Sequence, residues 1–171
     1  MKKFTVLIFA LLIALPTAAQ ESESKTTTTT YYLIRHAEKD RSDKTNRDPH
    51  LIEKGVKRAK LWADVFKNVK FDMIFSTNYN RTKETAQPTA ESQNVEVNIY
   101  DPRSIDTKAF MEKTKGKTVL IVGHSNTTPM FANGLLGEKK YDMIADDNNG
   151  NLYIVTINND SKSSSLLSIQ Q

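Results

Sequence analysis

Apolar residues along the chain follow two periods, which predict strands that alternate with helices. Short apolar or alternating runs are typical of strands, and apolar residues three to four positions apart are typical of amphipathic helices. Strands are expected over 30–34, 71–76, 95–100, 118–123, 151–158 and 166–169. Helices are expected over 51–66, 81–91, 105–114 and 128–136, the second of them bent or ended near Pro88. The polar stretch 158–165 is expected to be a turn that makes the last two strands antiparallel.

This order of elements favours an α/β fold, a three-layer sandwich with a largely parallel central sheet flanked by helices. The run TVLIVG at 118–123 is apolar without interruption, as in strands that helices cover on both faces. Ligands of such sheets bind beyond the carboxyl ends of the strands. The residues that directly follow the predicted strands are therefore the first candidates for a functional site.

Residues 1–19 differ from the rest of the chain and predict a secretory signal peptide. Two lysines precede an apolar run, and small residues precede a cleavage point before Gln20. The apolar run of about twelve residues is shorter than the ~20 that span a bilayer, so no membrane association is expected after cleavage. We expect the mature protein to be periplasmic or secreted. Residues 20–29 are expected to form a disordered leader, which leaves 30–171 as one domain.

Composition narrows the classes of protein and partner. The chain has 171 residues, of which 38% are hydrophobic and 26% charged, values that are ordinary for one globular domain. It contains no cysteine, so no disulfide contributes to stability. Without residues 1–19, 22 basic and 20 acidic residues remain, a net charge of +2. The basic residues are scattered and form no stripe interleaved with aromatic residues, so nucleic acid is not an expected partner.

Three polar motifs follow predicted strands and place two arginines and two histidines at one edge of the sheet. The side chains of interest are Arg35, His36, Asn78, Arg81, His124 and Ser125. Guanidinium groups donate forked pairs of hydrogen bonds that match phosphate oxygens, and a neutral imidazole is able to attack phosphorus and carry the phosphate covalently. The second imidazole would stabilise the group in transfer. The combination predicts chemistry on a phosphoryl group.

These motifs resemble those of a known family. "RHAEK" after the first strand, "FSTNYNRTKETAQPTA" after the second and "VGHSN" after the buried strand are similar, in this order, to the histidine phosphatase superfamily, branch one, whose fold is called phosphoglycerate mutase-like. The resemblance extends over 31–153 and includes "LIEKGVKRAKLWADVF", which is similar to the first helix of that family. It implies that His36 is the histidine that becomes phosphorylated. It also implies that Arg35, Arg81 and His124 complete the phosphate pocket.

The proton donor to the leaving group is left open by the resemblance. It points to an acid after the third strand, so Asp101 is the first candidate, and Glu38, two residues beyond the nucleophile, is the alternative. A site specific for phosphohistidine would need no dedicated acid, because its leaving group needs little protonation. Ala37 stands where the family most often has glycine, and its small side chain is expected to leave the pocket intact.

Three other polar regions receive structural interpretations. His50 is interpreted as a loop residue, Lys39 as part of a solvated loop, and residues 146–149 as a turn before the next strand. The loops 39–50, 101–108 and 137–150 would determine the substrate, and they show no decisive pattern.

We expect an exported, metal-independent phosphomonoesterase that hydrolyses a small phosphorylated substrate through a phosphohistidine at His36. No cofactor or metal is expected, because two arginines in one pocket would repel a cation and no paired histidine spacing is present. Two alternatives stay open: a phosphohistidine or phosphoprotein phosphatase, and a phosphate-binding module of the same fold without turnover. The sequence sets neither the phosphoester nor the oligomeric state.

Overall fold

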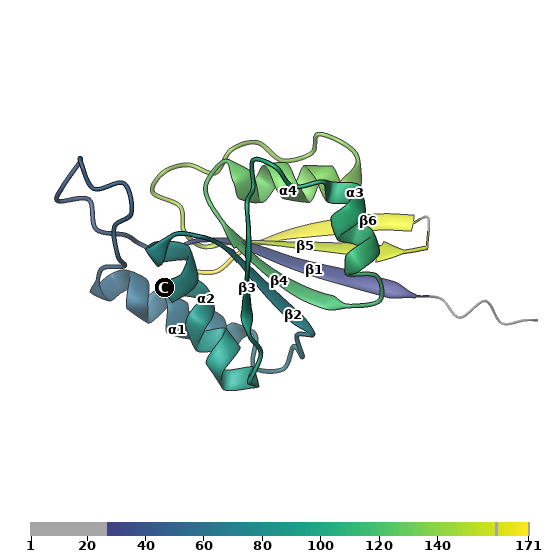
Figure 1. The fold of residues 1–171 in the computed structure, drawn as a ribbon, viewed down its shortest axis with the longest axis horizontal. Helices are drawn as coiled ribbons and strands as arrows, with labels where there is room; N and C mark the ends of the chain where they lie inside the picture. The colour runs from purple at the N-terminus through teal and green to yellow at the C-terminus, as the bar shows by residue number, and fades with distance from the viewer. Residues whose placement is uncertain (1–26, 160, 171) are drawn as a thin grey trace, which may run out of the picture.

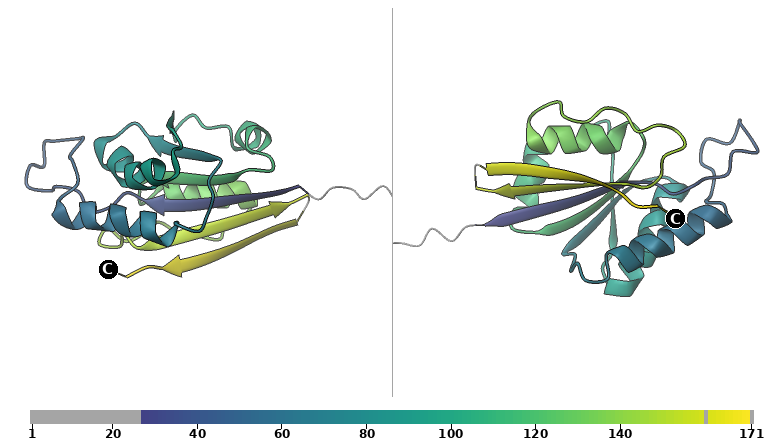
Figure 2. Two further views of the ribbon diagram at one scale, coloured as in Figure 1. Left: turned by 90° about the horizontal axis from the view of Figure 1, so that it is seen from below. Right: turned by 180° about the vertical axis from the view of Figure 1, so that it is seen from behind.

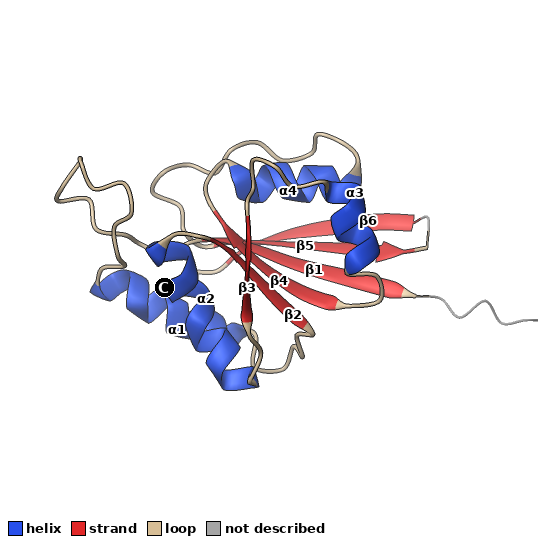
Figure 3. Ribbon diagram, viewed as in Figure 1, coloured by secondary structure: helices blue, strands red, loops and turns tan. Residues whose placement is uncertain are grey.

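The computed structural model describes residues 27–159 and 161–170, which form a six-stranded sheet with helices on both faces (Figures 1 and 3). In chain order the elements are β1 (Thr28–Arg35), α1 (Glu53–Val65), β2 (Met73–Thr77), α2 (Asn80–Gln93), β3 (Val97–Tyr100), α3 (Thr107–Lys113), β4 (Thr118–Gly123), α4 (Thr127–Leu136), β5 (Asn151–Asn158) and β6 (Ser161–Ser168). No helix in this part of the chain has the length and apolar character needed to cross a membrane.

The sheet is mostly parallel, as the alternation of strands and helices predicted. Its strand order is β3-β2-β4-β1-β5-β6. The first four strands in this order are parallel, whereas β5 runs antiparallel to β1, and β6 runs antiparallel to β5. Helices α1 and α2 cover one face and α3 and α4 the other (Figures 1 and 2). The parallel strands converge at their carboxyl ends (Figure 1), so the residues that follow them are neighbours in space.

Side chains alternate between the two faces of the sheet, so each central strand contributes to two cores. On β4, Val119 and Ile121 pack in the core beneath α3 and α4, while Leu120 and Val122 pack in the core beneath α1 and α2. The second of these cores includes Trp62 of α1. This confirms the prediction that the apolar run is buried on both faces.

Three boundaries differ from the sequence-based expectation. The stretch 158–165 was expected to be a turn, but β6 begins at Ser161 and its serines pair with β5 along the edge of the sheet. An edge strand pairs on one side only, which a polar run tolerates. Helix α2 continues through Pro88 to Gln93. Of the expected N-terminal segments, 1–19 and residues 20–26 of the leader lie outside the described residues, whereas Thr28 and Thr29, expected in the leader, belong to β1.

Candidate active site

His36 lies buried just beyond β1, and the main chain holds one of its ring nitrogens. Its backbone N–H donates to the carbonyl of Gly123 on β4 (2.9 Å), and its ring Nδ1 lies 2.7 Å from the carbonyl oxygen of Ala37. Because a carbonyl only accepts hydrogen bonds, Nδ1 carries the proton and Nε2 keeps its lone pair. This tautomer leaves Nε2 of His36 as a nucleophile.

His124 faces His36 from the carboxyl end of β4, with the ring centroids 5.5 Å apart. Its Nδ1 lies 3.5 Å from NH2 of Arg81, and its Nε2 lies 2.9 Å from Oγ1 of Thr77. Arginine only donates, so Nδ1 of His124 is the acceptor and Nε2 carries the proton. The hydroxyl of Thr77 donates to Thr82 (3.0 Å), which leaves a lone pair for the His124 N–H. The two histidines therefore present opposite tautomers.

Both imidazoles are neutral at physiological pH. Burial lowers the pKa of His36 to about 3, the hydrogen bond to Ala37 opposes this shift, and neighbouring positive charges reinforce it. Burial also lowers the pKa of His124 to about 4, with further contributions from the charges of Arg81, Arg35 and Lys39. Lys39, interpreted from the sequence as part of a solvated loop, is thus close enough to act on the site.

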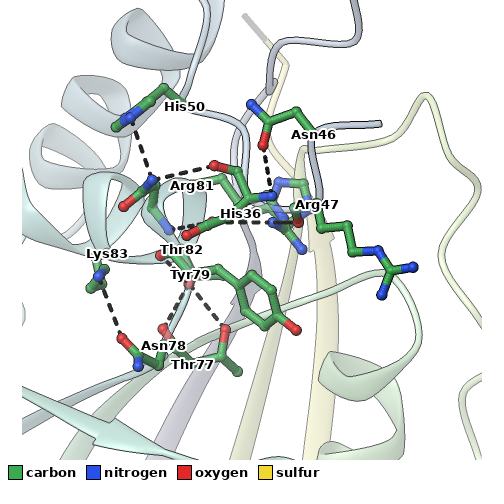
Figure 4. Close-up of polar contacts among 12 residues, drawn as sticks. His36, Asn46, Arg47, His50, Thr77, Asn78, Tyr79, Arg81, Thr82 and Lys83 are labelled. Atoms are coloured by element: carbon green, nitrogen blue, oxygen red, sulfur yellow. Dashed lines mark hydrogen bonds and ion pairs between the residues drawn. The ribbon is translucent and has the colours of Figure 1, made fainter. Parts of the chain in front are cut away.

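Arg81 lies in the first turn of α2, and the loop that precedes α1 holds it over the site (Figure 4). Its NH1 donates to the carbonyl of Arg47 (3.4 Å) and lies 3.6 Å from Oδ1 of Asp48. Its guanidinium carbon lies 4.3 Å from the centre of the Tyr79 ring, a cation–π contact. The same ring meets the imidazole of His124 edge-on at 5.1 Å. Arg81 is 9% exposed, so its charge acts in a poorly solvated place.

Arg35 is 2% exposed, and residues 145–148 bind one end of its guanidinium group. NH1 donates to the carbonyls of Ala145, Asp146 and Asn148 at 2.9–3.0 Å, and NH2 donates to Oδ1 of Asp146 at 2.9 Å. Asp146 also pairs with Arg41 (2.8 Å), and hydrogen bonds from Arg41 and Arg35 lower the pKa of Asp146 to about 2. These contacts leave the Nε–H and one NH2 hydrogen of Arg35 for a ligand.

A cavity of about 590 Å³ opens beside these residues. It is lined by Thr77, Asn78, Tyr79, Arg81, Ile99, Tyr100, Asp101, Pro102, Arg103, His124, Asn126 and Thr127. The predicted residues Arg81, His124, Asn78 and Asp101 thus lie along one cavity. Arg35, His36 and Ser125 are not among the lining residues. The carbonyl of Ser125 accepts from the backbone N–H of Ile144 (2.9 Å).

The two candidate acids have different surroundings, and neither is a free carboxylic acid. Glu38 points toward α1, where Arg58 binds both of its carboxylate oxygens at 2.9–3.0 Å. Burial acts to raise the pKa of Glu38, but Arg58 outweighs it and holds the pKa below its usual value. Asp101 lines the cavity, but its hydrogen bonds with Arg103 lower its pKa as well. Unlike Asp101, Glu38 is not among the residues that line the cavity.

Buried donors without acceptors mark the site as a place for a ligand. Nε of Arg35, Nε of Arg81 and the hydroxyl of Tyr100 are buried and have no hydrogen-bond partner. A Cβ atom on Gly123 would lie 3.1 Å from the Tyr100 hydroxyl, so this hydroxyl lies next to the residue that precedes His124. Unpaired buried donors are costly, and a ligand rich in oxygen would satisfy them.

His50 lies on the outer side of Arg81 rather than in the cavity (Figure 4). Its Nδ1 forms an ion pair with Glu84 of α2, whose second oxygen accepts from the backbone N–H of Leu51 (2.8 Å). The hydrogen bond with Glu84 raises the pKa of His50. His50 is thus a loop residue, as interpreted, with the added role of joining its loop to α2.

Sequence reasoning missed several residues that hold the site together. They are Thr77, Thr85, Tyr100, Asp146 and Asn149. Thr85 lies in a motif that the sequence did single out, but the main-chain group that it binds is 48 residues away along the chain. Asp146 lies 111 residues from Arg35, a separation that no local pattern reveals. Within the described residues, no group of three His, Asp or Glu side chains is placed to hold a metal ion.

Comparisons with known proteins agree with the motifs and the fold. Residues 31–102 match the model of the histidine phosphatase superfamily, branch 1. Phosphoserine phosphatase 1 of Hydrogenobacter thermophilus is 39% identical over 78 residues, which cover 43% of this chain and 36% of that protein, so the match spans about a third of the relative's length.

Solved structures show the same fold at low sequence identity. A phosphoserine phosphatase mutant from Entamoeba histolytica in complex with phosphoserine has a TM-score of 0.59 at 18% identity, covering 82% of this chain and 95% of that chain. The protein histidine phosphatase SixA complexed with tungstate has a TM-score of 0.63 at 14% identity, covering 81% and 96%. Over residues 31–102 the chain is thus similar to the histidine phosphatase superfamily, branch 1, and its fold is that of the solved phosphatases of this kind.

Proposed function

We propose that the protein is an exported, metal-independent phosphomonoesterase that hydrolyses a small phosphorylated substrate through a phosphohistidine at His36. One observation carries the proposal: a buried, neutral imidazole has its proton fixed on Nδ1 and its lone pair on Nε2, beside two buried arginines that each retain an unpaired Nε–H. A phosphoryl group supplies the oxygens that these donors lack, and its phosphorus is the electrophile for the lone pair.

The proposed reaction has two steps. In the first, Nε2 of His36 forms a bond to phosphorus while the bond between phosphorus and the ester oxygen breaks, and the leaving oxygen takes a proton. Arg35, Arg81 and His124 bind the non-bridging oxygens and stabilise the charge that develops on them. In the second, water bonds to phosphorus, the electron pair of the P–N bond returns to Nε2, and the proton of water passes to solvent. Inorganic phosphate then leaves.

Protonation of the leaving oxygen is the weakest part of the site. Asp101 is the one of the two predicted acids that lines the cavity, but its lowered pKa keeps it ionised at neutral pH. An ionised carboxylate donates no proton, so the site favours leaving groups that are stable without one. Proton transfer from solvent is sufficient for such substrates.

This weakness favours one alternative substrate class, the phosphohistidine of a protein. Its leaving group is an imidazole, which departs with less assistance than an alkoxide. The similarity in fold to the protein histidine phosphatase SixA agrees with this alternative, whereas the matched phosphoserine phosphatase agrees with a small phosphoester. Side-by-side rates on phosphoserine and on a phosphohistidine peptide separate the two.

Hydrolysis of p-nitrophenyl phosphate by residues 20–171 tests the proposal. The assay contains EDTA, covers pH 4 to 8 and includes the His36→Ala variant. We expect activity that persists with EDTA and is lost in His36→Ala. Loss of activity on chelation would contradict metal independence, and an active His36→Ala would exclude His36 as the nucleophile. A protein that binds vanadate without turnover would be a phosphate-binding module.

Export is tested separately, because residues 1–19 lie outside the described residues. We expect the full-length chain, expressed in a bacterium, to yield a product that begins near Gln20 outside the cytoplasm. Fractionation followed by mass spectrometry of the intact protein measures both properties. An uncleaved chain in the cytoplasm would contradict export and leave the proposed catalysis untouched.

A further inference from the structure

The turn at residues 145–149 contacts the backbone of His36 as well as the side chain of Arg35. Asn149 is buried, with 7% of its surface exposed. Its Nδ2 donates to the backbone carbonyl oxygen of His36 at 2.8 Å. From the sequence this residue belongs to a simple turn, but in the structure its amide lies against the peptide bond that follows His36.

The peptide unit between His36 and Ala37 is held from both sides. Asn149 binds its carbonyl, and Oγ1 of Thr85 accepts its N–H at 2.9 Å. The hydroxyl of Thr85 donates its own proton to the carbonyl of Arg81 (2.7 Å), so a lone pair is left for the N–H of Ala37. Rotation of this peptide unit would therefore break two buried hydrogen bonds.

The orientation of this peptide unit decides where the next carbonyl points. That carbonyl belongs to Ala37, and it accepts the Nδ1 proton of His36. Without an acceptor at Nδ1, an imidazole exchanges between its two tautomers, and Nε2 loses its lone pair for part of the time. The contact of Asn149 is therefore linked to the chemistry of His36 through one peptide bond and one carbonyl.

We propose that Asn149 is a positioning residue for the nucleophile. By holding the carbonyl of His36, it keeps the proton on Nδ1 and the lone pair on Nε2. The effect of Asn149 on catalysis rests on the proposed function, but its effect on the tautomer of His36 does not depend on turnover. The hold on Arg35 comes mainly from main-chain carbonyls of the same turn, which a substitution at Asn149 retains. The effect of such a substitution should fall on His36 and spare phosphate binding.

The test compares Asn149→Ala with a matched control, Asn133→Ala, in the full chain. Asn133 also donates its amide to a backbone carbonyl, that of Tyr141 (2.7 Å), but it lies on α4 and does not line the cavity. Three measurements are made on both variants: the tautomer of His36 by ¹⁵N NMR at pH 7, kcat on p-nitrophenyl phosphate, and inhibition by inorganic phosphate. The chain has three histidines, so the imidazole signals are readily assigned.

We expect Asn149→Ala to mix the tautomers of His36 and to lower kcat by about ten- to a hundredfold, the cost of a misplaced reacting group. Inhibition by phosphate should stay close to that of the wild type, and Asn133→Ala should keep both the wild-type tautomer and the wild-type kcat. An unchanged tautomer in Asn149→Ala would overturn the proposal whatever the activity, and so would an unchanged kcat or an equal loss in Asn133→Ala.

The outcomes also separate this proposal from the proposed function. If the wild type does not turn over but Asn149→Ala mixes the tautomers, the positioning role stands and the hydrolase proposal fails. If Asn149→Ala does not fold, Asn149→Asp keeps the shape of the side chain and removes the donor when ionised. It should mix the tautomers in the same way, and a wild-type tautomer in Asn149→Asp would overturn the positioning role.

Discussion

The inner and outer ends of the candidate site are built differently. At the inner end, Arg35 and His36 are buried and do not line the cavity. Apart from the Ala37 carbonyl at Nδ1 of His36, their hydrogen-bond partners lie about 85 to 113 residues away in the sequence. At the outer end, Asp101 and Arg103 are exposed and bind mainly each other, two residues apart. Long-range contacts fix the inner groups before a substrate arrives, whereas a local ion pair in water is easily exchanged. The inner end is thus suited to one chemical group and the outer end to varied leaving groups.

Substituting one cation at each end gives the largest expected contrast. Arg81→Met removes a buried charge that lines the cavity and keeps an apolar stem, so kcat/KM should fall by about a hundred- to a thousandfold, as when one transition-state donor is lost. Arg103→Met, at the outer end, should change kcat/KM on p-nitrophenyl phosphate only slightly. Steady-state kinetics on both variants, with urea unfolding as a check on folding, measure the contrast. Equal losses would show that the outer end is as strongly organised as the inner end.

The pH dependence of stability should differ in sign between the inner His36 and the outer His50. Unfolded His36 binds a proton below pH 6.5, but the folded protein does not until about pH 3, so this group destabilises the fold as the pH falls from about 6.5. At pH 5 the effect is about 2 kcal/mol. The raised pKa of His50 works in the opposite direction, and its pair with Glu84 contributes stability that is present at low pH and lost as the pH rises.

Urea unfolding at pH 7 and pH 5 tests the direction of each effect. When the pH is lowered from 7 to 5, the free energy of unfolding should fall by about 2 kcal/mol less in His36→Gln than in the wild type. His50→Gln should lose slightly more than the wild type. If His36→Gln loses as much stability between pH 7 and pH 5 as the wild type does, His36 is protonated in the folded state at pH 5.

The contrast between local and long-range contacts also explains what could be predicted from the sequence. His36 and His124 directly follow apolar strands, and strands are readable from local periodicity, so their convergence followed from the parallel sheet. Glu38 shows the limit of that reasoning. Its nearness to His36 along the chain does not say which side it faces, and its partner Arg58 lies on a helix whose rotation about its own axis is set by packing. The reason for a glycine at position 55 is visible only in the structure, where a Cβ atom would come within 2.1 Å of the Glu38 carbonyl oxygen.

The contacts of residues 145–149 could not be predicted, because they join the two ends of the domain. Nothing in a stretch of acids and asparagines distinguishes a surface turn from one that binds Arg35. The tertiary fold brings this turn to the carboxyl end of β1 through the antiparallel pairing of β1 and β5. The catalytic motifs are thus local, whereas the hydrogen bonds that orient them are not.

A smaller effect is expected from the support that Thr85 gives to the inner end. Thr85→Val removes the acceptor for the Ala37 N–H without changing the shape of the side chain, so kcat should fall by about tenfold and stability by about 1–3 kcal/mol. Thr89, one turn along α2, is also fully buried, but its hydroxyl has no partner, so Thr89→Val should leave kcat unchanged and stability equal or higher. Kinetics and urea unfolding of the two variants give the result. Equal kcat values would show that the N–H of Ala37 needs no acceptor for catalysis.

The smallest effect is expected from Asp101, the candidate acid at the outer end. A dedicated general acid contributes about a hundredfold or more to the departure of an alkoxide. Because Arg103 keeps the pKa of Asp101 low, we expect Asp101→Asn to lower the rate on phosphoserine only by about threefold and to leave p-nitrophenyl phosphate unaffected. Glu38→Gln should act on stability instead, since it leaves the buried Arg58 without its carboxylate. A hundredfold loss on phosphoserine alone in Asp101→Asn would show that substrate binding displaces Arg103 and turns Asp101 into an acid. The outer end would then be organised by the substrate, in contrast to an inner end that is organised by the fold.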